Sequence, residues 1–536
     1  MLNYIHELVK QSADSTPHAL ALQVNECCLT YQQLNTQIEQ FAYHLASIST
    51  PKQRIGIYLN KNSENVVTMF ACSSTSLIFV PINPVLKAAQ VQHIIDDCQV
   101  QTLVTNKARL NGLSKVLSSM HSIKTIIVTD ADTQELAQLS DNFANINFTP
   151  WPSNSKTIKQ TPFASTAPSI NDIACILYTS GSTGKPKGIM ISHQNLILGA
   201  ESVSQYLQNT SQDKILAVLP FSFDYGLNQL ISSFLVGAQC ILLDYLFPQD
   251  VIKAVEKYKV TGLAAVPALW SQLCEIKWSE QAKSIRYFTN SGGVLAQHCL
   301  QTLRDRMPTA EPFLMYGLTE AFRSTYLAPN EIDTRVGSIG KAIPNAEIKV
   351  IRADGSECGV DETGQLIHSG PLVTLGYWQD IAKTQERFKP FGDCKEVAVF
   401  SGDYVKKDSD GFLYFVGRKD EMIKTSGYRV SPTEIEECLL QLTEISNAVI
   451  FGKPDDVLGQ VIIAYVQLAQ PLKAEFDSKQ LEKRLLRHTK EQLANYMLPK
   501  EFHFINELPI NANGKIDRNK LRLDYLANLQ TAKINK

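Results

Sequence analysis

A stretch of eleven residues in the first half of the chain combines groups that could hold phosphate. It contains three glycines, four Ser or Thr residues and two lysines, in the order Tyr178-Thr179-Ser180-Gly181-Ser182-Thr183-Gly184-Lys185-Pro186-Lys187-Gly188. Glycine lets backbone N–H groups approach an anion, while hydroxyls and lysines add donors and positive charge. Apolar runs at 173–177 and 189–191 flank the stretch. The pattern predicts a polyphosphate-binding loop between two core elements.

The spacing of this loop excludes two common nucleotide-binding motifs. A P-loop needs four residues between its first Gly and the Gly-Lys pair, followed by Ser or Thr. Here two residues separate Gly181 from Gly184, and Pro186 follows Lys185. The segment also lacks G-x-G-x-x-G. A flexible surface loop is the remaining alternative, and it is disfavoured because a linker has no need of phosphate-binding groups between two apolar runs.

A second candidate site centres on Glu320, in the segment Tyr316-Gly317-Leu318-Thr319-Glu320. A carboxylate beside a hydroxyl can bind Mg²⁺ through oxygen ligands and waters. The alternative is an acidic residue stabilised by the dipole at a helix N-terminus. The pair Thr319 and Glu320 is therefore a candidate metal and phosphate site.

Together with six further segments between residues 220 and 520, the loop resembles the adenylate-forming, or AMP-binding, superfamily. This superfamily includes acyl-CoA synthetases, adenylation domains of nonribosomal peptide synthetases and firefly luciferase. The segments occur in the family's order, so the resemblance covers nearly the whole chain. Residues 221–230, 316–327 and 417–432 are most similar to stand-alone exosortase-associated acyl-CoA ligases of the AMP-forming type.

The resemblance implies a site for ATP and Mg²⁺. The loop would bind the β- and γ-phosphates, Tyr316 would stack near adenine, and Asp403 would accept the ribose hydroxyls. The implied nucleotide-binding set is Thr179, Ser180, Gly181, Ser182, Thr183, Gly184, Lys185, Ser291, Gly292, Gly293, Tyr316, Gly317, Asp403 and Arg418. Without the family, residues 291–293 could form an ordinary strand-to-helix turn, and Asp403 with Arg418 a surface ion pair.

The same resemblance assigns catalytic roles to Lys515, Glu320, Thr319 and Lys187. Glu320 would bind Mg²⁺ and Thr319 would contact the α-phosphate. Lys515, on a Gly-rich turn, would bridge the substrate carboxylate and the α-phosphate, whereas an isolated lysine is otherwise solvated.

The resemblance also implies a moving C-terminal domain. Asp420 would be its hinge, and the loop containing Lys424 and Gly427 would line a tunnel for the thiol in a second half-reaction.

The family's acid-binding position falls on residues 220–228. Candidate substrate-binding residues are Phe223, Asp224, Tyr225, Asn228 and Arg323. Amino-acid-activating members place an aspartate here that binds the substrate ammonium, and Asp224 matches it. An unpaired carboxylate would disfavour an apolar acyl chain. The alternatives are a helix N-cap for Asp224 and a structural salt bridge for Arg323, which would otherwise suit a polar or anionic substrate end.

These roles imply an ATP-dependent acid–thiol ligase. It would activate a carboxylic acid, in the favoured case an amino acid, as acyl-AMP with release of pyrophosphate. No carrier domain follows the last motif, so we expect the acceptor to be the phosphopantetheine of a separate carrier protein. The alternative is an acyl-CoA synthetase that uses free CoA on a fatty or other acid. A non-catalytic nucleotide-binding protein is disfavoured because Lys515, Glu320, Asp403 and Arg418 retain the residues that the chemistry needs. Nothing supports luciferase-like oxidation.

Alternating strands and helices must position these side chains. Strands are predicted at 54–59, 101–105, 214–220, 239–243, 261–266 and 285–290, and helices from 31, at 63–80 and 87–97, from 227, and at 248–258. This alternation predicts an α/β fold of helix-covered, mostly parallel sheets. Shorter strands after 335, at 346–351 and 364–369, predict a β-rich subdomain. A helix starting at Pro432, strands at 447–451 and 461–468 and a helix at 477–493 predict an α+β unit.

We therefore expect an N-terminal AMP-binding domain over 1–419, with the β-rich subdomain at 335–419, and a mobile C-terminal lid domain over 420–536. The chain has 536 residues, of which 44% are hydrophobic and 19% charged, which is typical of globular proteins. With a net charge of −2 and no basic cluster, no nucleic-acid partner is expected. The absence of a signal peptide, of a membrane span and of metal-type Cys spacing predicts a cytoplasmic protein with reduced thiols.

Overall fold

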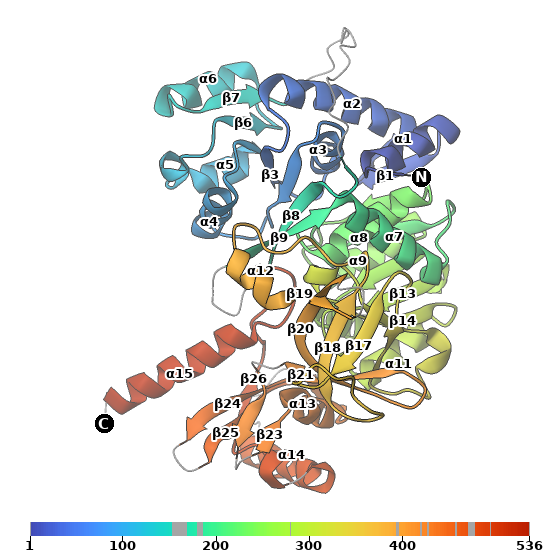
Figure 1. The fold of residues 1–536 in the computed structure, drawn as a ribbon, viewed down its shortest axis with the longest axis vertical. Helices are drawn as coiled ribbons and strands as arrows, with labels where there is room; N and C mark the ends of the chain where they lie inside the picture. Colours follow the sequence, from blue (N-terminus) through green and yellow to red (C-terminus); the bar gives the residue numbers. More distant parts are fainter. Residues whose placement is uncertain are drawn as a thin grey trace.

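The computed structural model consists of two large sheets with helices between and outside them, followed by a smaller C-terminal unit (Figure 1). It describes residues 2–152, 169–179, 186–278, 280–392, 396–418, 421–425, 428–455, 458–469, 477–493 and 495–534. The mixed α/β class predicted from the sequence is confirmed.

The first sheet carries the phosphate-loop strands at its edge. Its strand order is β7-β6-β5-β3-β4-β8-β9. All neighbours are parallel except β8 and β9, which are antiparallel. The strands are β3 (Arg54–Tyr58), β4 (Ile78–Pro81), β5 (Thr102–Thr105), β6 (Thr125–Val128), β7 (Asn147–Pro150), β8 (Ile173–Thr179) and β9 (Lys187–Ser192). Most are buried on both faces, as helix-covered parallel strands must be.

The second sheet joins a parallel part to an antiparallel part. Its order is β17-β18-β20-β21-β16-β15-β14-β13-β12-β10-β11-β1-β2, with β19 paired to β20. The strands of the parallel part and its edge are β1 (Leu20–Val24), β2 (Cys27–Thr30), β10 (Lys214–Ala217), β11 (Gln239–Leu242), β12 (Gly262–Ala265), β13 (Tyr287–Asn290) and β14 (Glu311–Tyr316). The antiparallel part contains β15 (Thr325–Leu327), β16 (Ser338–Ala342), β17 (Glu347–Ile351), β18 (Gly364–Ser369), β19 (Phe388–Phe391), β20 (Glu396–Lys407) and β21 (Leu413–Arg418). The predicted β-rich region is thus continuous with the large sheet through β15.

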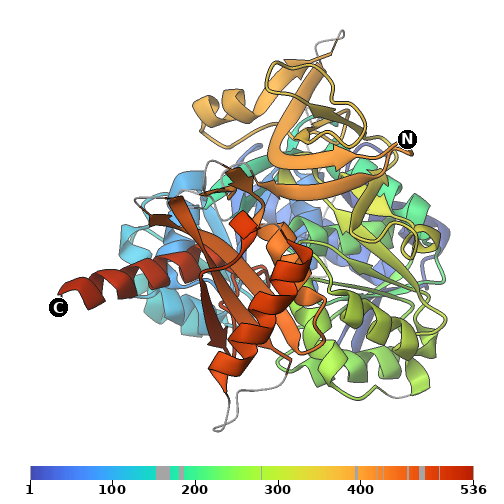
Figure 2. The ribbon, with the colours of Figure 1, turned by 90° about the horizontal axis from the view of Figure 1, so that it is seen from below.

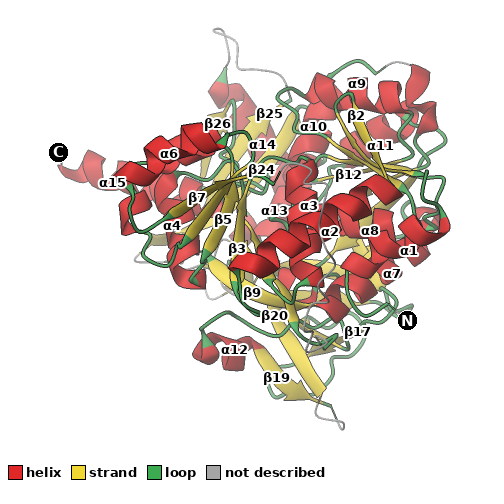
Figure 3. Cartoon of the chain, turned by 90° about the horizontal axis from the view of Figure 1, so that it is seen from above, coloured by secondary structure: helices red, strands yellow, loops and turns green. Residues whose placement is uncertain are grey.

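A layer of helices lies between the two sheets, and Figure 3 shows α2 and α3 in this position between β3 and β12. The layer contains α1 (His6–Ser15), α2 (Tyr31–Ile48), α3 (Ser63–Ser74), α7 (His193–Leu207) and α8 (Asp224–Leu235). The outer face of the first sheet packs on α4 (Ala88–Cys98), α5 (Lys107–Leu113) and α6 (Thr133–Asn142). The outer face of the second packs on α9 (Pro248–Tyr258), α10 (Pro267–Glu275) and α11 (Gln297–Arg306). Side-chain caps begin several of these helices: Thr30 and Gln33 form a capping box at α2, and Ser192 and Asn195 another at α7.

The C-terminal unit has hydrophobic clusters of its own and is seen from below in Figure 2. Its strands are β22 (Ile423–Thr425) and β23 (Tyr428–Val430), which form a hairpin, and β24 (Ile445–Asp455), β25 (Gly459–Leu468) and β26 (Glu501–Ile505), which form a sheet. Its helices are α13 (Pro432–Leu440), α14 (Ser478–Gln492) and α15 (Arg518–Ile534). Helix α12 (Ile381–Arg387) is not part of this unit and lies directly before β19 in the chain. The predicted helix start at Pro432 is confirmed, with Ser431 as its N-cap.

Two elements differ from the sequence prediction. The expected helix at 63–80 ends at Ser74, and the residues after the turn form β4. The apolar run is continuous across both, and a buried strand cannot be told from a buried helix by periodicity alone. Ser76, with a φ of 56°, breaks the helix between them. Helix α8 begins at Asp224, one turn earlier than predicted. The predicted boundary at 419/420 lies outside the described residues, so the domain limits 1–419, 335–419 and 420–536 stay predictions.

Candidate active site

The ends of β8 and β9 close the base of the predicted phosphate loop. Thr179 pairs directly with Lys187 in the antiparallel register. The hydroxyl of Tyr178, the preceding residue, donates a hydrogen bond of 2.5 Å to the carboxylate of Asp97 on α4. The pairing holds the two ends of the loop together and brings Lys187 beside Thr179. The loop residues themselves lie outside the described residues: Ser180, Gly181, Ser182, Thr183, Gly184 and Lys185.

Lys515 reaches the end of β13 from a turn in the C-terminal unit. The Oδ1 of Asn511 accepts hydrogen bonds from the backbone N–H groups of Asn513 and Lys515, and Gly514 has a φ of 78°. A Cβ placed on Gly292 would lie 2.7 Å from Cε of Lys515. The ammonium lies 4.8 Å from the ring centre of Phe223, just before α8. The turn thus brings Lys515 together with two predicted site segments that are distant in the chain.

Asn83 anchors the same turn on the N-terminal region. Its Nδ2 donates a hydrogen bond of 2.5 Å to the carbonyl of Ala512 and also lies 3.5 Å from Oδ1 of Asn513. Asn83 is buried directly after β4. A Cβ on Gly514 would lie 3.3 Å from Val266, at the end of β12. The turn is therefore held between the ends of strands from both large sheets.

Asp403 and Arg418 face each other across paired strands. They are register partners on β20 and β21, and Nε of Arg418 lies 3.1 Å from Oδ1 of Asp403. The hydroxyl of Tyr316 donates to the other carboxylate oxygen. Burial raises the pKa of Asp403, against the opposing effects of the Arg418 guanidinium and the Tyr316 hydroxyl. Asp403 is buried and the Arg418 side chain is exposed, so the ion pair considered from the sequence lies at the surface only on the arginine side.

Glu320 is fixed by a tyrosine that the sequence analysis did not identify. Thr319 and Glu320 lie in a 3₁₀ turn after β14, over Thr319–Ala321. The hydroxyl of Tyr377 donates a 2.6 Å hydrogen bond to Oε1 of Glu320. The hydroxyl of Thr374 donates to the carbonyl of Glu320 at 2.9 Å. One carboxylate oxygen of Glu320 is thus oriented by Tyr377, as second-sphere groups orient metal ligands.

A strained turn directs Arg323 inward. Phe322 has φ 54° and ψ −43°, and the N–H of Arg323 donates to the carbonyl of Ala321 at 2.6 Å. This is a γ-turn of the rare, strained type, which costs a non-glycine residue about 1–3 kcal/mol. The Phe322 ring is buried against Gly199, where a Cβ would lie 2.2 Å from the ring. The packing of this ring holds the turn in place.

Asp224 and Arg323 are both buried in the predicted acid pocket. Asp224 is the first residue of α8 and makes no N-cap, because Phe223 occupies that position. Cζ of Arg323 lies 4.5 Å from the ring centre of Tyr225. Tyr225 in turn forms a 2.5 Å hydrogen bond with Thr289 on β13. Thr289 and Asn228 also line a small cavity of about 20 Å³ beyond Tyr225.

The charged groups of the pocket influence one another. Burial raises the pKa of Asp224, and the nearby Arg323 and Lys515 oppose that shift. Burial lowers the pKa of Lys515, and the Asp224 carboxylate opposes that shift. The carboxylates of Asp224 and Asp403 both act to raise the pKa of Lys515. The turn that carries Lys515 therefore lies near the acid pocket and near the Asp403 site.

The predicted hinge and thiol tunnel lie largely outside the described residues. Asp420 and Gly427 lie outside the described residues. Lys424 pairs with Arg429 in the β22–β23 hairpin, but only its backbone is described. The predicted hinge and thiol tunnel therefore stay predictions.

Asn83 and Tyr377 are the functional candidates that the sequence analysis missed. Asn83 is a polar residue in an otherwise apolar or proline run, Pro81-Ile82-Asn83-Pro84, which was a usable signal. The sequence around Tyr377 gave no such signal, because Tyr377 lies 57 residues from its partner Glu320.

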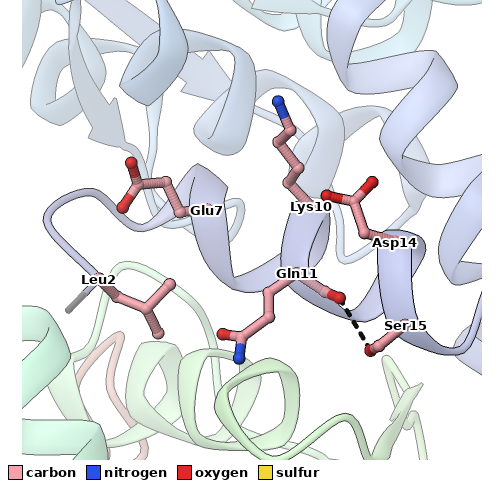
Figure 4. A pocket seen from close by; sticks show the side chains of 6 residues that line it. All are labelled: Leu2, Glu7, Lys10, Gln11, Asp14 and Ser15. Atoms are coloured by element: carbon pink, nitrogen blue, oxygen red, sulfur yellow. Dashed lines mark hydrogen bonds between the residues drawn. The ribbon is translucent and has the colours of Figure 1, made fainter.

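Elsewhere, a hollow on α1 is lined by Leu2, Glu7, Lys10, Gln11, Asp14 and Ser15 (Figure 4). It includes none of the predicted site residues. Within the described ranges, His, Cys, Asp and Glu side chains form no group of three that could hold a metal ion. In the same ranges, no helix is long and apolar enough to cross a membrane.

Comparison with protein families gives two matches. A model described as AMP-binding enzyme matches residues 9–378, and one described as AMP-binding enzyme C-terminal domain matches residues 434–515. Tyrocidine synthase 3 of Brevibacillus parabrevis is 29% identical over 96% of this chain, which spans 8% of that protein. The indoleacetate–CoA ligase of Aromatoleum aromaticum is 26% identical over 97% of this chain and 97% of its own length.

Solved structures share the fold. An anthranilate CoA ligase, AuaEII, in complex with anthranoyl-AMP superposes with a TM-score of 0.84 at 23% identity, covering 98% of both chains. The o-succinylbenzoate CoA synthetase of Bacillus subtilis, in complex with ATP and magnesium ion, has a TM-score of 0.76 at 26% identity. That match covers 96% of this chain and 99% of the synthetase.

Proposed function

The chain belongs to the AMP-binding enzyme family, whose members activate acids by ATP-dependent adenylation, and from this premise we propose that it is an acid–thiol ligase. It would join a carboxylic acid, in the favoured case an amino acid, to AMP with release of pyrophosphate. It would then transfer the acyl group to a phosphopantetheine thiol on a separate carrier protein.

The observation that carries the proposal is the position of Lys515. This lysine comes from the C-terminal unit and lies against Gly292 and Phe223, which belong to two different predicted ligand segments. The reaction brings a carboxylate to the α-phosphate of ATP, so two anions must approach each other. A half-buried ammonium at the meeting point would offset their repulsion.

The other residues would hold the two reactants in line. Asp403 would accept the ribose hydroxyls, with Arg418 beside it, and Thr319 would contact the α-phosphate. Lys187, paired with Thr179, would neutralise the departing pyrophosphate. One carboxylate oxygen attacks the α-phosphorus, the bond to the β-phosphate oxygen breaks, and pyrophosphate leaves. The contribution of the protein is mainly positioning and electrostatic stabilisation.

The residues around Glu320 fit a magnesium ion. Mg²⁺ is usually bound by one or two protein carboxylates, with substrate phosphates and waters completing the shell. Glu320 would supply such a carboxylate, oriented by Tyr377. When bound, the ion would supply positive charge at the phosphates. The ATP- and magnesium-bound neighbour supports both ligands.

Asp224 supports an amine-bearing acid. Its carboxylate is buried, and Oδ1 has no hydrogen-bond partner among the described residues. A substrate ammonium would satisfy it, whereas an alkyl chain would leave the charge unpaired.

The alternative is an acyl-CoA synthetase that uses free CoA on another carboxylic acid. It is favoured by full-length relatives named as CoA ligases, including the 2-succinylbenzoate–CoA ligase of Bacillus licheniformis.

Exchange of labelled pyrophosphate into ATP, measured across amino acids and fatty acids, tests the proposal. The proposal predicts exchange with at least one amino acid and little with fatty acids. Exchange with fatty acids alone would support the CoA synthetase alternative. For an acid that supports exchange, product analysis with CoA and with a phosphopantetheinylated carrier protein then separates the two acceptors.

A further inference from the structure

The acid pocket concentrates buried polar atoms that have no hydrogen-bond partner among the described residues. They come from the start and first turns of α8, the end of β13 and the γ-turn after the Glu320 segment. They are Oγ of Ser222, Oδ1 of Asp224, Nδ2 of Asn228, Oε1 of Gln229, Oδ1 of Asn290, and Nε and Nη2 of Arg323. Buried polar groups in native proteins are almost always hydrogen-bonded. Asn228 and Gln229 line the small cavity beyond Tyr225, and the Arg323 guanidinium lies over the Tyr225 ring. Unpartnered buried polar atoms on these neighbouring elements indicate a polar ligand that completes the bonds.

Arg323 is the most informative member. It is 3% exposed, and two of its guanidinium nitrogens are without partners in the described part of the chain. No ion pair within 4.0 Å between described residues includes Arg323 or Asp224. Its guanidinium stacks on Tyr225 instead. A buried guanidinium that stacks but makes no ion pair is available for an anion.

The backbone turn at Phe322 holds the Arg323 side chain in the protein interior. The γ-turn at Phe322 is strained, and its ring is locked against Gly199 on α7. Strained backbone of this kind is found mainly at functional sites. The turn immediately follows Glu320, so the pocket residue and the predicted metal ligand are positioned by one element.

The charges of the pocket lie near one another without forming an ion pair. Asp224 begins α8, and the guanidinium of Arg323 lies over the ring of Tyr225, the next residue. Lys515 is close enough to affect the pKa of Asp224, as is Arg323. Under the proposed function, Lys515 receives the reacting carboxylate and Asp224 the amine. Arg323 then remains for a second anionic group.

We propose that the activated acid is an acidic amino acid, whose second carboxylate is bound by the guanidinium of Arg323. This assignment rests on the proposed function and names its substrate class. A carboxylate matches the planar fork of a guanidinium with two parallel hydrogen bonds. Asn228, one turn along α8 from Asp224, has a free Nδ2 that could donate to the same group.

Matched substrates test the assignment on the wild-type enzyme. Pyrophosphate exchange is measured with L-glutamate against L-glutamine and with L-aspartate against L-asparagine, at saturating ATP. Each pair differs by one charge at nearly constant size. We expect kcat/KM for the acid in at least one pair to exceed that for its amide by about 10²-fold or more, because the amide leaves the guanidinium uncompensated. Preference for the amides, or for hydrophobic amino acids, would overturn the assignment while leaving adenylation intact.

Variants test the role of the guanidinium itself. Arg323→Gln and Arg323→Met remove the charge while keeping much of the side-chain volume. In both variants, we expect the ratio of kcat/KM for the acid to kcat/KM for its amide to fall towards one. An equal loss for acid and amide would show that Arg323 does not recognise the second carboxylate, and would overturn the assignment. Because the wild-type comparison needs no variant, the test stands even if these proteins fold poorly. No exchange with any acid would overturn both this assignment and the proposed function.

Discussion

The side chain of Asn83 donates a 2.5 Å hydrogen bond to the backbone carbonyl of Ala512, across a separation of 429 residues. Asn83 follows β4 of the first sheet, and Ala512 lies three residues before Lys515 in the C-terminal unit. The contact therefore holds the Lys515 turn against the N-terminal region. In a family where the C-terminal domain is expected to rotate between half-reactions, such a contact would stabilise one orientation over the other.

Replacement of Asn83 by alanine should weaken the docking of the Lys515 turn. The lost hydrogen bond leaves the half-buried carbonyl of Ala512 unpaired, which costs about 1–3 kcal/mol. We expect pyrophosphate exchange to fall by roughly 5- to 150-fold, with a smaller effect on thioester formation from supplied acyl-adenylate. Asn106→Ala is the control, because it removes a helix cap on α5 without touching the turn. Equal losses in both half-reactions for Asn83→Ala would contradict a role in docking.

We expect adenylation to require glycine at position 292, because a side chain there would occupy the space taken by Lys515. The φ of Gly292 is 85°, and an added Cβ would lie 2.7 Å from Cε of the lysine. Gly355 has a φ of 89° and nothing within 4 Å of an added Cβ, so Gly355→Ala carries a similar backbone cost alone. We expect Gly292→Ala to reduce adenylation about 10-fold or more and Gly355→Ala to leave it near wild type. Similar exchange rates for the two variants would show that the space beside Gly292 is unimportant.

Tyr377→Phe should weaken the binding of magnesium. The variant keeps the ring packed on Phe388 and removes the hydroxyl that orients Glu320. Loss of such an outer-shell partner typically costs about 10- to 100-fold in metal affinity. The measurement is the Mg²⁺ concentration that gives half-maximal exchange. Tyr31→Phe, which removes a core hydroxyl bonded to the carbonyl of Ala238, is the control. An unchanged Mg²⁺ requirement in Tyr377→Phe would argue against Glu320 as the metal ligand.

The raised pKa of Asp224 predicts an acidic limb in the pH profile for amino-acid substrates. Burial raises this pKa above the ordinary value of 3.8, so the carboxyl becomes protonated at a higher pH than usual. Protonation removes the charge that would bind the substrate ammonium, and kcat/KM should fall as the pH falls through the raised pKa. The pKa of Asp403, the proposed ribose ligand, is raised as well. The profile is therefore measured at saturating ATP, which limits the effect of Asp403 protonation on the observed rate. The limb should disappear in Asp224→Asn. Its persistence in that variant would assign the titration to another group.

The sequence predicted the elements whose signals are local. The phosphate loop is bracketed by an apolar run on each side, and β8 and β9 appear there. Asp403 and Arg418 were expected to act together, as nucleotide ligands or as an ion pair, and the two residues are register partners. The helix predicted to start at Pro432 begins at that residue. Each of these depends on residues that are near one another in the chain.

Contacts that depend on packing between distant segments were not predictable in this way. Nothing near Tyr377 indicates that its hydroxyl reaches Glu320. The γ-turn at Phe322 exists because its ring fits against Gly199, more than a hundred residues away. The run after Ser63 was assigned to one helix because a buried strand and a buried helix share the same apolar pattern. In the acid pocket, the sequence suggested Asp224 and Arg323, but only the structure shows that both are buried and do not pair with each other.

The central claim is that Lys515 serves the adenylation step, and Lys515→Ala tests it most directly. Two rates are measured on the same protein: pyrophosphate exchange with the acid that supports it, and thioester formation from supplied acyl-adenylate. We expect exchange to fall by about 10²- to 10³-fold or more, as for loss of one electrostatic contact in a transition state, while the thioester rate stays near wild type. An equal loss in both reactions, or no loss of exchange, would contradict the claim.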